Sequence, residues 1–185
     1  MGAAQGRIQV YTGDGKGKTT AALGLLLRFI GSGGNAVLVQ FDKGAGAGDF
    51  YGERKLFPLL PGLVHHPTGL VRFVPEKGTF RFQNVKGDFE EAHRGMALAR
   101  TALTSGAGLV VLDEVLSLLL TGLLEESQIH TLLDEYERLG RPCELVLTGH
   151  KMTPQLEQRA DLITRMENVK HYFDQGVVAR KGIEY

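Results

Sequence analysis

The sequence predicts an α/β fold in which a doubly wound, mostly parallel sheet is flanked by helices, and two observations support this prediction. Four short runs rich in Val, Ile and Leu are continuous rather than alternating, a pattern typical of parallel strands covered on both faces. Segments with helical periodicity lie between these runs, which favours right-handed crossover connections. The strands are expected at residues 8–11, 36–41, 109–112 and 144–147.

Each expected helix is recognised by an apolar stripe, a start signal or a stop signal. The first, over residues 20–30, precedes a Gly-Ser-Gly-Gly run that suits helix termination. The helices over 89–105 and 127–139 carry apolar residues at helical spacing, and the latter stops at a glycine. The last, over 154–160, begins with proline, which the first turn of a helix tolerates.

The whole chain, residues 1–185, is expected to form one domain with a loop-rich insertion around 44–86. That insertion is rich in glycine and proline, and aromatic residues are interleaved with them. Long loops in compact domains are often functional. A variable surface segment whose aromatic residues serve only in packing explains the composition equally well.

Composition and charge exclude several classes of partner. The 21 basic and 21 acidic side chains balance, so no global field indicates a nucleic acid or an anionic membrane as partner. The apolar stretches at 23–30 and 110–124 are interrupted by charged residues, and residues 1–6 lack the features of a signal peptide. The single cysteine, Cys143, begins an apparent core strand, and its isolation is typical of a reducing cytoplasm.

The most informative stretch lies directly after the first expected strand and opens the first expected helix. It reads Gly13-Asp14-Gly15-Lys16-Gly17-Lys18-Thr19-Thr20. Glycines allow backbone N–H groups to close around phosphate oxygens, and a helix N-terminus adds unpaired donors and a positive dipole end. Lys18 is expected to act on the outer phosphates and Thr19 to offer its hydroxyl to Mg²⁺. The stretch therefore predicts a P-loop NTPase (RecA-like) fold.

This loop departs from the standard phosphate-loop pattern by one residue. The pattern G-x-x-x-x-G-K-[ST] requires a glycine at position 12, where Thr12 stands, and the first glycine comes one residue later at Gly13. The loop is therefore tighter, and it carries a second lysine, Lys16, close to Lys18. A glycine turn with two solvated lysines is the alternative interpretation.

A second polar element follows the strand expected at 109–112. Asp113 and Glu114 end this apolar run, and a carboxylate there suits Mg²⁺, which prefers oxygen ligands. Glu114 could orient the substrate or polarise a water. Carboxylates are also favourable at any helix N-terminus, so that interpretation stays open. At the next strand end, His150 suits either a phosphate contact or an exposed turn.

These motifs together resemble the P-loop type of ATP:corrinoid adenosyltransferase, which modifies cob(I)alamin or cob(I)yrinic acid a,c-diamide. The matching segments run through nearly the whole chain in order. They are residues 11–22 (YTGDGKGKTTAA), 39–44 (VQFDKG), 111–114 (VLDE), 169–176 (VKHYFDQG) and 179–185 (ARKGIEY).

The resemblance implies that a Co(I) corrinoid attacks the 5′ carbon of ATP and that the whole triphosphate departs. It implies Lys16, Lys18 and Glu114 as catalytic residues, and Thr19, Asp113 and Glu114 as residues that serve Mg²⁺. It also implies a homodimer and a flavoprotein that supplies electrons. The residues implied to bind ATP are Thr12, Gly13, Asp14, Gly15, Lys16, Gly17, Lys18, Thr19 and Thr20 in the loop, with Arg28, Lys170, His171 and Asp174 outside it.

The chain departs from the family pattern in the corrinoid half. The family places an aromatic pair shortly after a Thr-Gly step, whereas Thr68-Gly69 is followed here by one nearby aromatic residue, Phe73. Two other functions therefore stay open on the residues alone. One is a P-loop phosphotransferase or NTPase, and the other is a non-catalytic ATP-binding protein of cobalamin metabolism.

Overall fold

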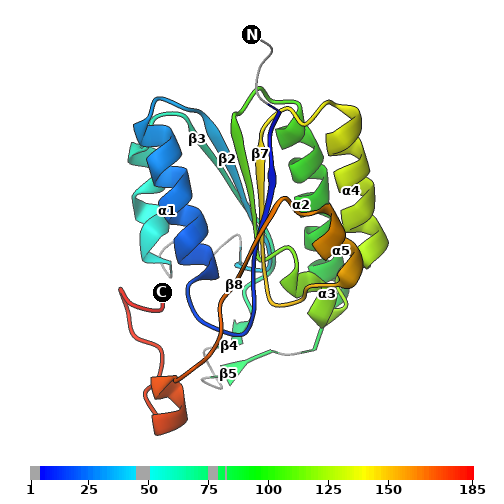
Figure 1. The fold of residues 1–185 in the computed structure, drawn as a ribbon. Coiled ribbons are helices and arrows are strands. Elements are labelled where there is room, and N and C mark those ends of the chain that lie inside the picture. Colours follow the sequence, from blue (N-terminus) through cyan, green and yellow to red (C-terminus); the bar gives the residue numbers. More distant parts are fainter. Residues whose placement is uncertain (1–4, 45–50, 75–78, 82) are drawn as a thin grey trace.

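A computed structural model describes residues 5–44, 51–74, 79–81 and 83–185. In this part of the chain, six parallel strands form one sheet with the order β3-β2-β6-β7-β1-β8 (Figure 1). The strands are β1 (Ile8–Thr12), β2 (Ala36–Gln40), β3 (Leu63–Pro67), β6 (Leu109–Asp113), β7 (Glu144–Thr148) and β8 (Leu162–Arg165). The predicted α/β fold of the P-loop type is confirmed.

Helices cover both faces of this sheet. The helices are α1 (Lys18–Gly31), α2 (Lys86–Leu103), α3 (Ser117–Thr121), α4 (Glu126–Arg138) and α5 (Pro154–Arg159). Helix α1 packs on one face, and α2 and α4 lie on the other, so the structure has three layers (Figure 1). Short 3₁₀ turns are found at Gly52–Lys55, Phe57–Leu59 and Tyr172–Gln175, and a separate antiparallel ladder pairs β4 (Phe73–Val74) with β5 (Thr79–Phe80).

The core explains why the strand sequences are continuously apolar. In β6, Val110 and Leu112 belong to the cluster beneath α2 and α4, whereas Leu109 and Val111 belong to the cluster beneath α1. All four are at most 1% exposed. Successive side chains point to opposite faces of a strand, so a strand buried on both faces needs apolar residues at every position.

The four predicted strands and four predicted helices are present with shifted ends, but two strands of the main sheet were missed. Strands β3 and β8 are the edges of the sheet, and their sequences, LVHHP and LITR, mix polar with apolar residues. The segment predicted to be rich in loops, 44–86, contains the edge strand β3, the β4–β5 ladder and two short 3₁₀ turns. Residues 45–50, 75–78 and 82 of that segment lie outside the described residues.

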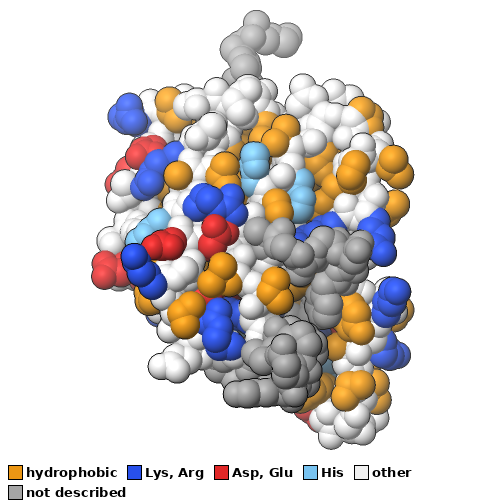
Figure 2. Space-filling view, turned by 180° about the vertical axis from the view of Figure 1, so that it is seen from behind, with side chains coloured by type: hydrophobic (Ala, Val, Ile, Leu, Met, Phe, Trp, Pro, Cys, Tyr) orange, Lys and Arg blue, Asp and Glu red, His pale blue; other side chains and the backbone are white. Residues whose placement is uncertain are grey.

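Charge and apolar surface agree with the balanced composition. Figure 2 shows acidic, basic and hydrophobic side chains interspersed over one face rather than gathered by type. Within the described residues, none of the helices combines the length and apolar character needed to cross a bilayer.

The parallel arrangement brings the carboxyl ends of the four strands β1, β2, β6 and β7 to the same edge of the sheet, which runs across the strand ends and is distinct from the edge strands β3 and β8. Gln40 pairs in register with Asp113 across β2 and β6, and Tyr11 pairs with Thr148 across β1 and β7. The loop that follows β1 leads directly into α1 at this edge. Since ligands of such sheets bind at the carboxyl ends of the strands, this edge is the expected site.

Candidate functional site

The loop between β1 and α1 has the backbone geometry of an anion cradle. Gly13 and Gly17 have φ angles of 104° and 119°, values that residues with a Cβ atom rarely adopt. A Cβ atom on Gly13 would also lie 2.3 Å from the carbonyl oxygen of Met166, which follows β8. The Gly15 N–H donates to the same oxygen at 2.8 Å. The glycines are thus required both for the turn and for the close approach of the segment after β8.

Helix α1 begins at this loop without a side-chain cap. Its N-cap residue is Gly17, and its first turn contains no acidic residue. The first N–H groups of a helix have no intrahelical partner, and the dipole makes that end positive. The start of α1 therefore favours a bound anion such as phosphate.

Lys18 folds back over the loop. Its Nζ donates to the carbonyl oxygens of Gly13 and Gly15 at 2.7 and 2.9 Å, and the residue is 6% exposed. Burial lowers the pKa of this ammonium, although the nearby carboxylates Glu114 and Asp14 act in the opposite direction. A phosphate bound at the loop would supply the negative charge that the carbonyl oxygens only partly provide.

A cavity of about 600 Å³ is lined by the phosphate loop, by residues that follow β6 and β7, and by C-terminal residues. Its size is suited to a small-molecule ligand. It contains the loop residues 14–20 together with Glu114, His150 and His171, so these predicted site residues come together. Thr12 and Gly13 line a neighbouring cavity that shares Asp14 and His150.

Three predicted ATP-binding residues are placed elsewhere. Arg28 lies in the last turn of α1, at the opposite end of the helix from the loop. Lys170 and Asp174 are exposed in the C-terminal segment, and neither lines the cavity.

Asp113 is the centre of a buried polar network at the end of β6. Its Oδ1 accepts hydrogen bonds from the hydroxyls of Thr19 at 2.9 Å and Thr148 at 2.8 Å. Its Oδ2 accepts one from the amide of Gln40 at 3.3 Å and lies 3.3 Å from Nζ of Lys43. With an exposure of 1%, this carboxylate has lost its contact with water, and these partners replace that contact.

Glu114 is positioned by the same network. Its φ of 64° turns the chain sharply after the strand, and its N–H donates to the Thr148 hydroxyl at 2.8 Å. The Glu114 carboxylate accepts a hydrogen bond from Ser117, in the first turn of α3. Thr148 therefore links Asp113 and Glu114, a role that the sequence did not indicate.

The oxygen ligands suit magnesium more than a softer metal. A hydroxyl, Thr19, and a carboxylate, Asp113, already lie within hydrogen-bond distance of each other. In the described residues, this site included, no group of three or more His, Cys, Asp and Glu side chains could hold a metal. Magnesium usually keeps several waters and binds through one or two carboxylates plus substrate phosphates, which fits this sparse protein ligand set.

Lys16 is held by the C-terminal segment rather than by the loop. Its Nζ donates to the Glu184 carboxylate at 2.7 Å, the Tyr172 hydroxyl at 3.0 Å and the Ile183 carbonyl at 3.1 Å. Arg180 and Lys16 hold the pKa of Glu184 well below its usual range. The last residues of the chain thus close one side of the cavity, a contact that no local sequence signal could reveal.

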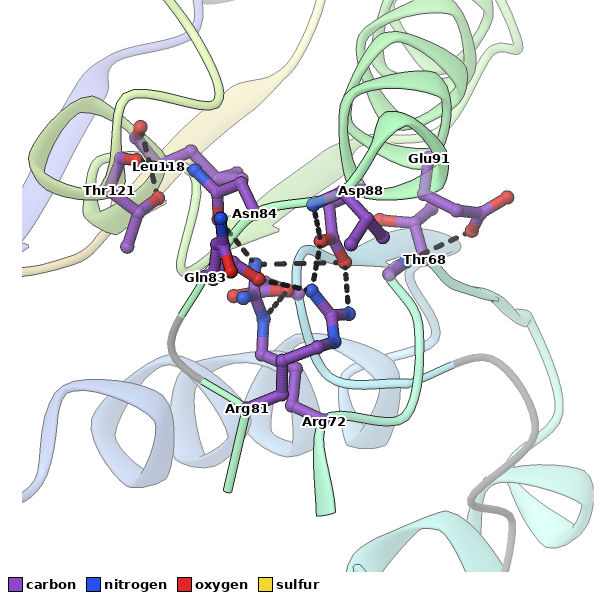
Figure 3. Close-up of polar contacts among 12 residues, drawn as sticks. Thr68, Arg72, Arg81, Gln83, Asn84, Asp88, Glu91, Leu118 and Thr121 are labelled. Atoms are coloured by element: carbon purple, nitrogen blue, oxygen red, sulfur yellow. Dashed lines mark hydrogen bonds and ion pairs between the residues drawn. The ribbon is translucent and has the colours of Figure 1, made fainter. Parts of the chain in front are cut away.

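A second network fastens the segment around the β4–β5 ladder to the start of α2. Arg81 donates two hydrogen bonds to Asp88, at 2.6 and 2.9 Å, and Asp88 also accepts from the Val85 N–H at 2.8 Å. Arg72 points toward the same carboxylate (Figure 3). It also donates to Asp42 at 2.8 Å. Figure 1 shows the β4–β5 ladder beyond the end of the sheet at which the phosphate loop lies. The ladder pairs Phe73 with Phe80 in register.

Comparisons with known proteins agree with this geometry. A family model described as ATP:corrinoid adenosyltransferase BtuR/CobO/CobP matches residues 4–185. A corrinoid adenosyltransferase of Pseudomonas aeruginosa is 33% identical over 98% of this chain and 84% of its own length. The corrinoid adenosyltransferase CobA of Salmonella typhimurium is 34% identical over 98% of this chain and 86% of its own length. A corrinoid adenosyltransferase of Escherichia coli K12 is 33% identical with the same coverage.

Proposed function

Since the chain belongs to the ATP:corrinoid adenosyltransferase family and transfers the adenosyl group of ATP to a corrinoid, we propose that the cavity beside residues 13–19 is where this reaction occurs. The observation that carries the proposal is the uncapped start of α1, where the first helical residue is the buried Lys18. An anion-binding helix end is suited to the triphosphate of ATP.

The protein's part in this reaction is electrostatic. A Co(I) nucleophile carries no proton, so no general base is needed when it attacks the 5′ carbon. Negative charge accumulates on the departing triphosphate, and fixed donors aimed at that charge lower the barrier. The N–H groups at the start of α1 and the ammonium of Lys18 are these donors, and Lys16 adds a second positive charge at the rim.

Thr19 and Asp113 would hold Mg²⁺, with Glu114 beside them. The metal would neutralise part of the triphosphate charge. The hydrogen bond between Thr19 and Asp113 supports this assignment, because it already brings two hard oxygen ligands together.

The finer assignments follow from the family. The family implies Arg28, Lys170, His171 and Asp174 for the nucleoside half of ATP. Among these four, His171 lines the cavity, so we propose His171 as the nucleoside contact, whereas Arg28, Lys170 and Asp174 lie outside the cavity. The active form is proposed to be a cytoplasmic, single-domain homodimer that receives electrons from a flavoprotein. The buried free thiol of Cys143 suits a reducing compartment.

One anaerobic incubation tests this function. ATP, Mg²⁺ and chemically reduced cobalamin are mixed with the protein, the Co–C bond is followed by absorbance, and the phosphate products are separated. We expect adenosylcobalamin and inorganic triphosphate in equal amounts. Release of ADP and orthophosphate without an alkylated corrinoid would instead indicate phosphoryl transfer.

Substitution of Lys18 tests the location of the site. We expect Lys18→Ala to lower the rate of adenosyl transfer at least about 100-fold, the scale of losing one preorganised donor to a developing anion. Lys86→Ala is the matched control, because the Lys86 side chain is 92% exposed. Wild-type activity in Lys18→Ala would place the reaction elsewhere.

A further inference from the structure

Lys43 is a largely buried cation that contacts two of the proposed magnesium ligands. Its Nζ lies 3.2 Å from the Thr19 hydroxyl and 3.3 Å from Oδ2 of Asp113. The side chain is 14% exposed and lines the same cavity as the phosphate loop. The phosphate-loop pattern does not include this residue, which follows β2 instead.

The backbone around Lys43 is fixed by several contacts. The Lys43 N–H donates to the Thr68 carbonyl at 3.0 Å, while the guanidinium of Arg54 donates to the carbonyls of Lys43 and Gly44 at 3.1 and 3.0 Å. Arg54 is itself 7% exposed. The ammonium also lies 5.4 Å from the centre of the Tyr51 ring, within the range of a cation–π contact. The lysine is therefore held in place before any ligand binds.

A buried ammonium needs a reason, because removing it from water is costly. The Asp113 carboxylate, 3.3 Å away, offsets part of this cost. Asp113 does not need it for hydrogen bonding, since Thr19, Thr148 and Gln40 already donate to that carboxylate.

The position of Lys43 suits the triphosphate. Thr19 is the second residue of α1, so an anion held by the first turn of this helix lies beside the Lys43 ammonium. We propose that Lys43 is a further triphosphate-binding residue of the adenosyl transfer reaction, an inference that depends on the nucleotide site proposed above. Without nucleotide, its ammonium contacts both Thr19 and Asp113 and opposes binding of a divalent cation to them.

Two binding measurements on Lys43→Met test this inference. This substitution removes the charge and keeps a long, unbranched side chain. We expect calorimetry with inorganic tripolyphosphate to show affinity about tenfold or more below that of the wild type, the scale of one charge-assisted hydrogen bond. We also expect nucleotide-free Lys43→Met to bind Mn²⁺ more tightly by electron paramagnetic resonance. The control Lys86→Met should match the wild type in both.

The outcomes separate this inference from the proposed function. Unchanged tripolyphosphate affinity in folded Lys43→Met overturns the assignment of Lys43 to the triphosphate. If the same variant binds Mn²⁺ more tightly, Lys43 serves only as a counter-ion of Asp113. Lys18→Ala is measured in parallel. If it loses tripolyphosphate binding while Lys43→Met does not, only the assignment of Lys43 fails. If neither loses it, the nucleotide site itself is misplaced.

A wild-type measurement covers the case in which Lys43→Met does not fold. Protein labelled with ¹³C at lysine Cε is titrated with tripolyphosphate, and the Lys43 signal is assigned by its absence from Lys43→Arg. We expect this signal to shift on binding, whereas that of exposed Lys86 should not. A Lys43 signal that stays in place while tripolyphosphate saturates the protein overturns the inference.

Discussion

Thr148→Val should weaken both the stability of the protein and the proposed metal site. The Thr148 side chain is fully buried, and its hydroxyl donates to Asp113 and accepts from the Glu114 N–H, both at 2.8 Å. Valine has almost the same shape, so the substitution removes these two hydrogen bonds with little change in packing. It leaves the Glu114 N–H without its partner and a buried carboxylate with one donor fewer.

The size of the effect follows from these two losses. A hydrogen bond to a charged group contributes about 1.5–3 kcal/mol, and a buried N–H left unpaired costs about 1–3 kcal/mol. Valine recovers about 1 kcal/mol through its additional apolar group. The free energy of unfolding should therefore fall by about 3 kcal/mol, and the melting temperature by about 6–12 °C for a chain of this length.

Urea unfolding followed by circular dichroism measures the loss of stability. Thr131→Val is the matched control, because Thr131 is exposed on α4 and its hydroxyl bonds to the Ser127 carbonyl of the same helix. The control should stay within about 0.5 kcal/mol of the wild type. Thr148→Ser keeps the hydroxyl and should recover most of the lost stability. A Thr148→Val variant within about 1 kcal/mol of the wild type would refute the argued role of this hydroxyl.

Two further substitutions test groups at the edges of the site. His65 lies on β3, and its Nε2 is 2.9 Å from Oε1 of Gln40, which itself contacts Asp113. Burial, followed by the charge of Arg54, lowers the pKa of His65 from 6.5 to about 4, so its contribution to stability is present above about pH 6.5 and is lost as the pH falls towards 4. Between pH 6.5 and 4 the free energy of unfolding should therefore fall less steeply for His65→Gln than for the wild type or for the exposed control His93→Gln. An unchanged slope in His65→Gln would contradict the lowered pKa of His65. Glu184→Gln should release the C-terminal segment from Lys16, so trypsin should remove that segment several-fold faster than in the exposed control Glu157→Gln. Equal cleavage rates would mean that this ion pair does not hold the segment.

The sequence located the phosphate loop and the Asp113 carboxylate because both depend on local rules. The loop needs glycines at a strand-to-helix turn, and Asp113 needs only to end a buried parallel strand. Parallel strands bring their carboxyl ends together, so the two elements could be placed at one edge without knowing the strand order. Strands β3 and β8 obey no such rule, since edge strands are half exposed and tolerate polar residues.

The partners of the loop could not be predicted in the same way, because they arrive from distant parts of the chain. Thr148 reaches Asp113 across 35 positions, and Glu184 reaches Lys16 across 168. A hydroxyl at a strand end and a glutamate near the end of the chain are common features. Their significance depends on the register of β6 against β7 and on the path of the chain after β8.

The two loop lysines show where local chemistry stops being informative. Lys16 and Lys18 are two positions apart, and the sequence assigns both to phosphates. In the structure, Lys18 turns inward onto carbonyl oxygens of its own loop, which leaves its charge available to an anion. Lys16 turns outward to Glu184, so a phosphate would have to compete with a carboxylate for it. Lys43, which reaches the cavity from another strand, has the buried position that Lys16 lacks. The second cation beside Lys18 is therefore set by the folding of β2 against β6 and α1, and not by the composition of the loop.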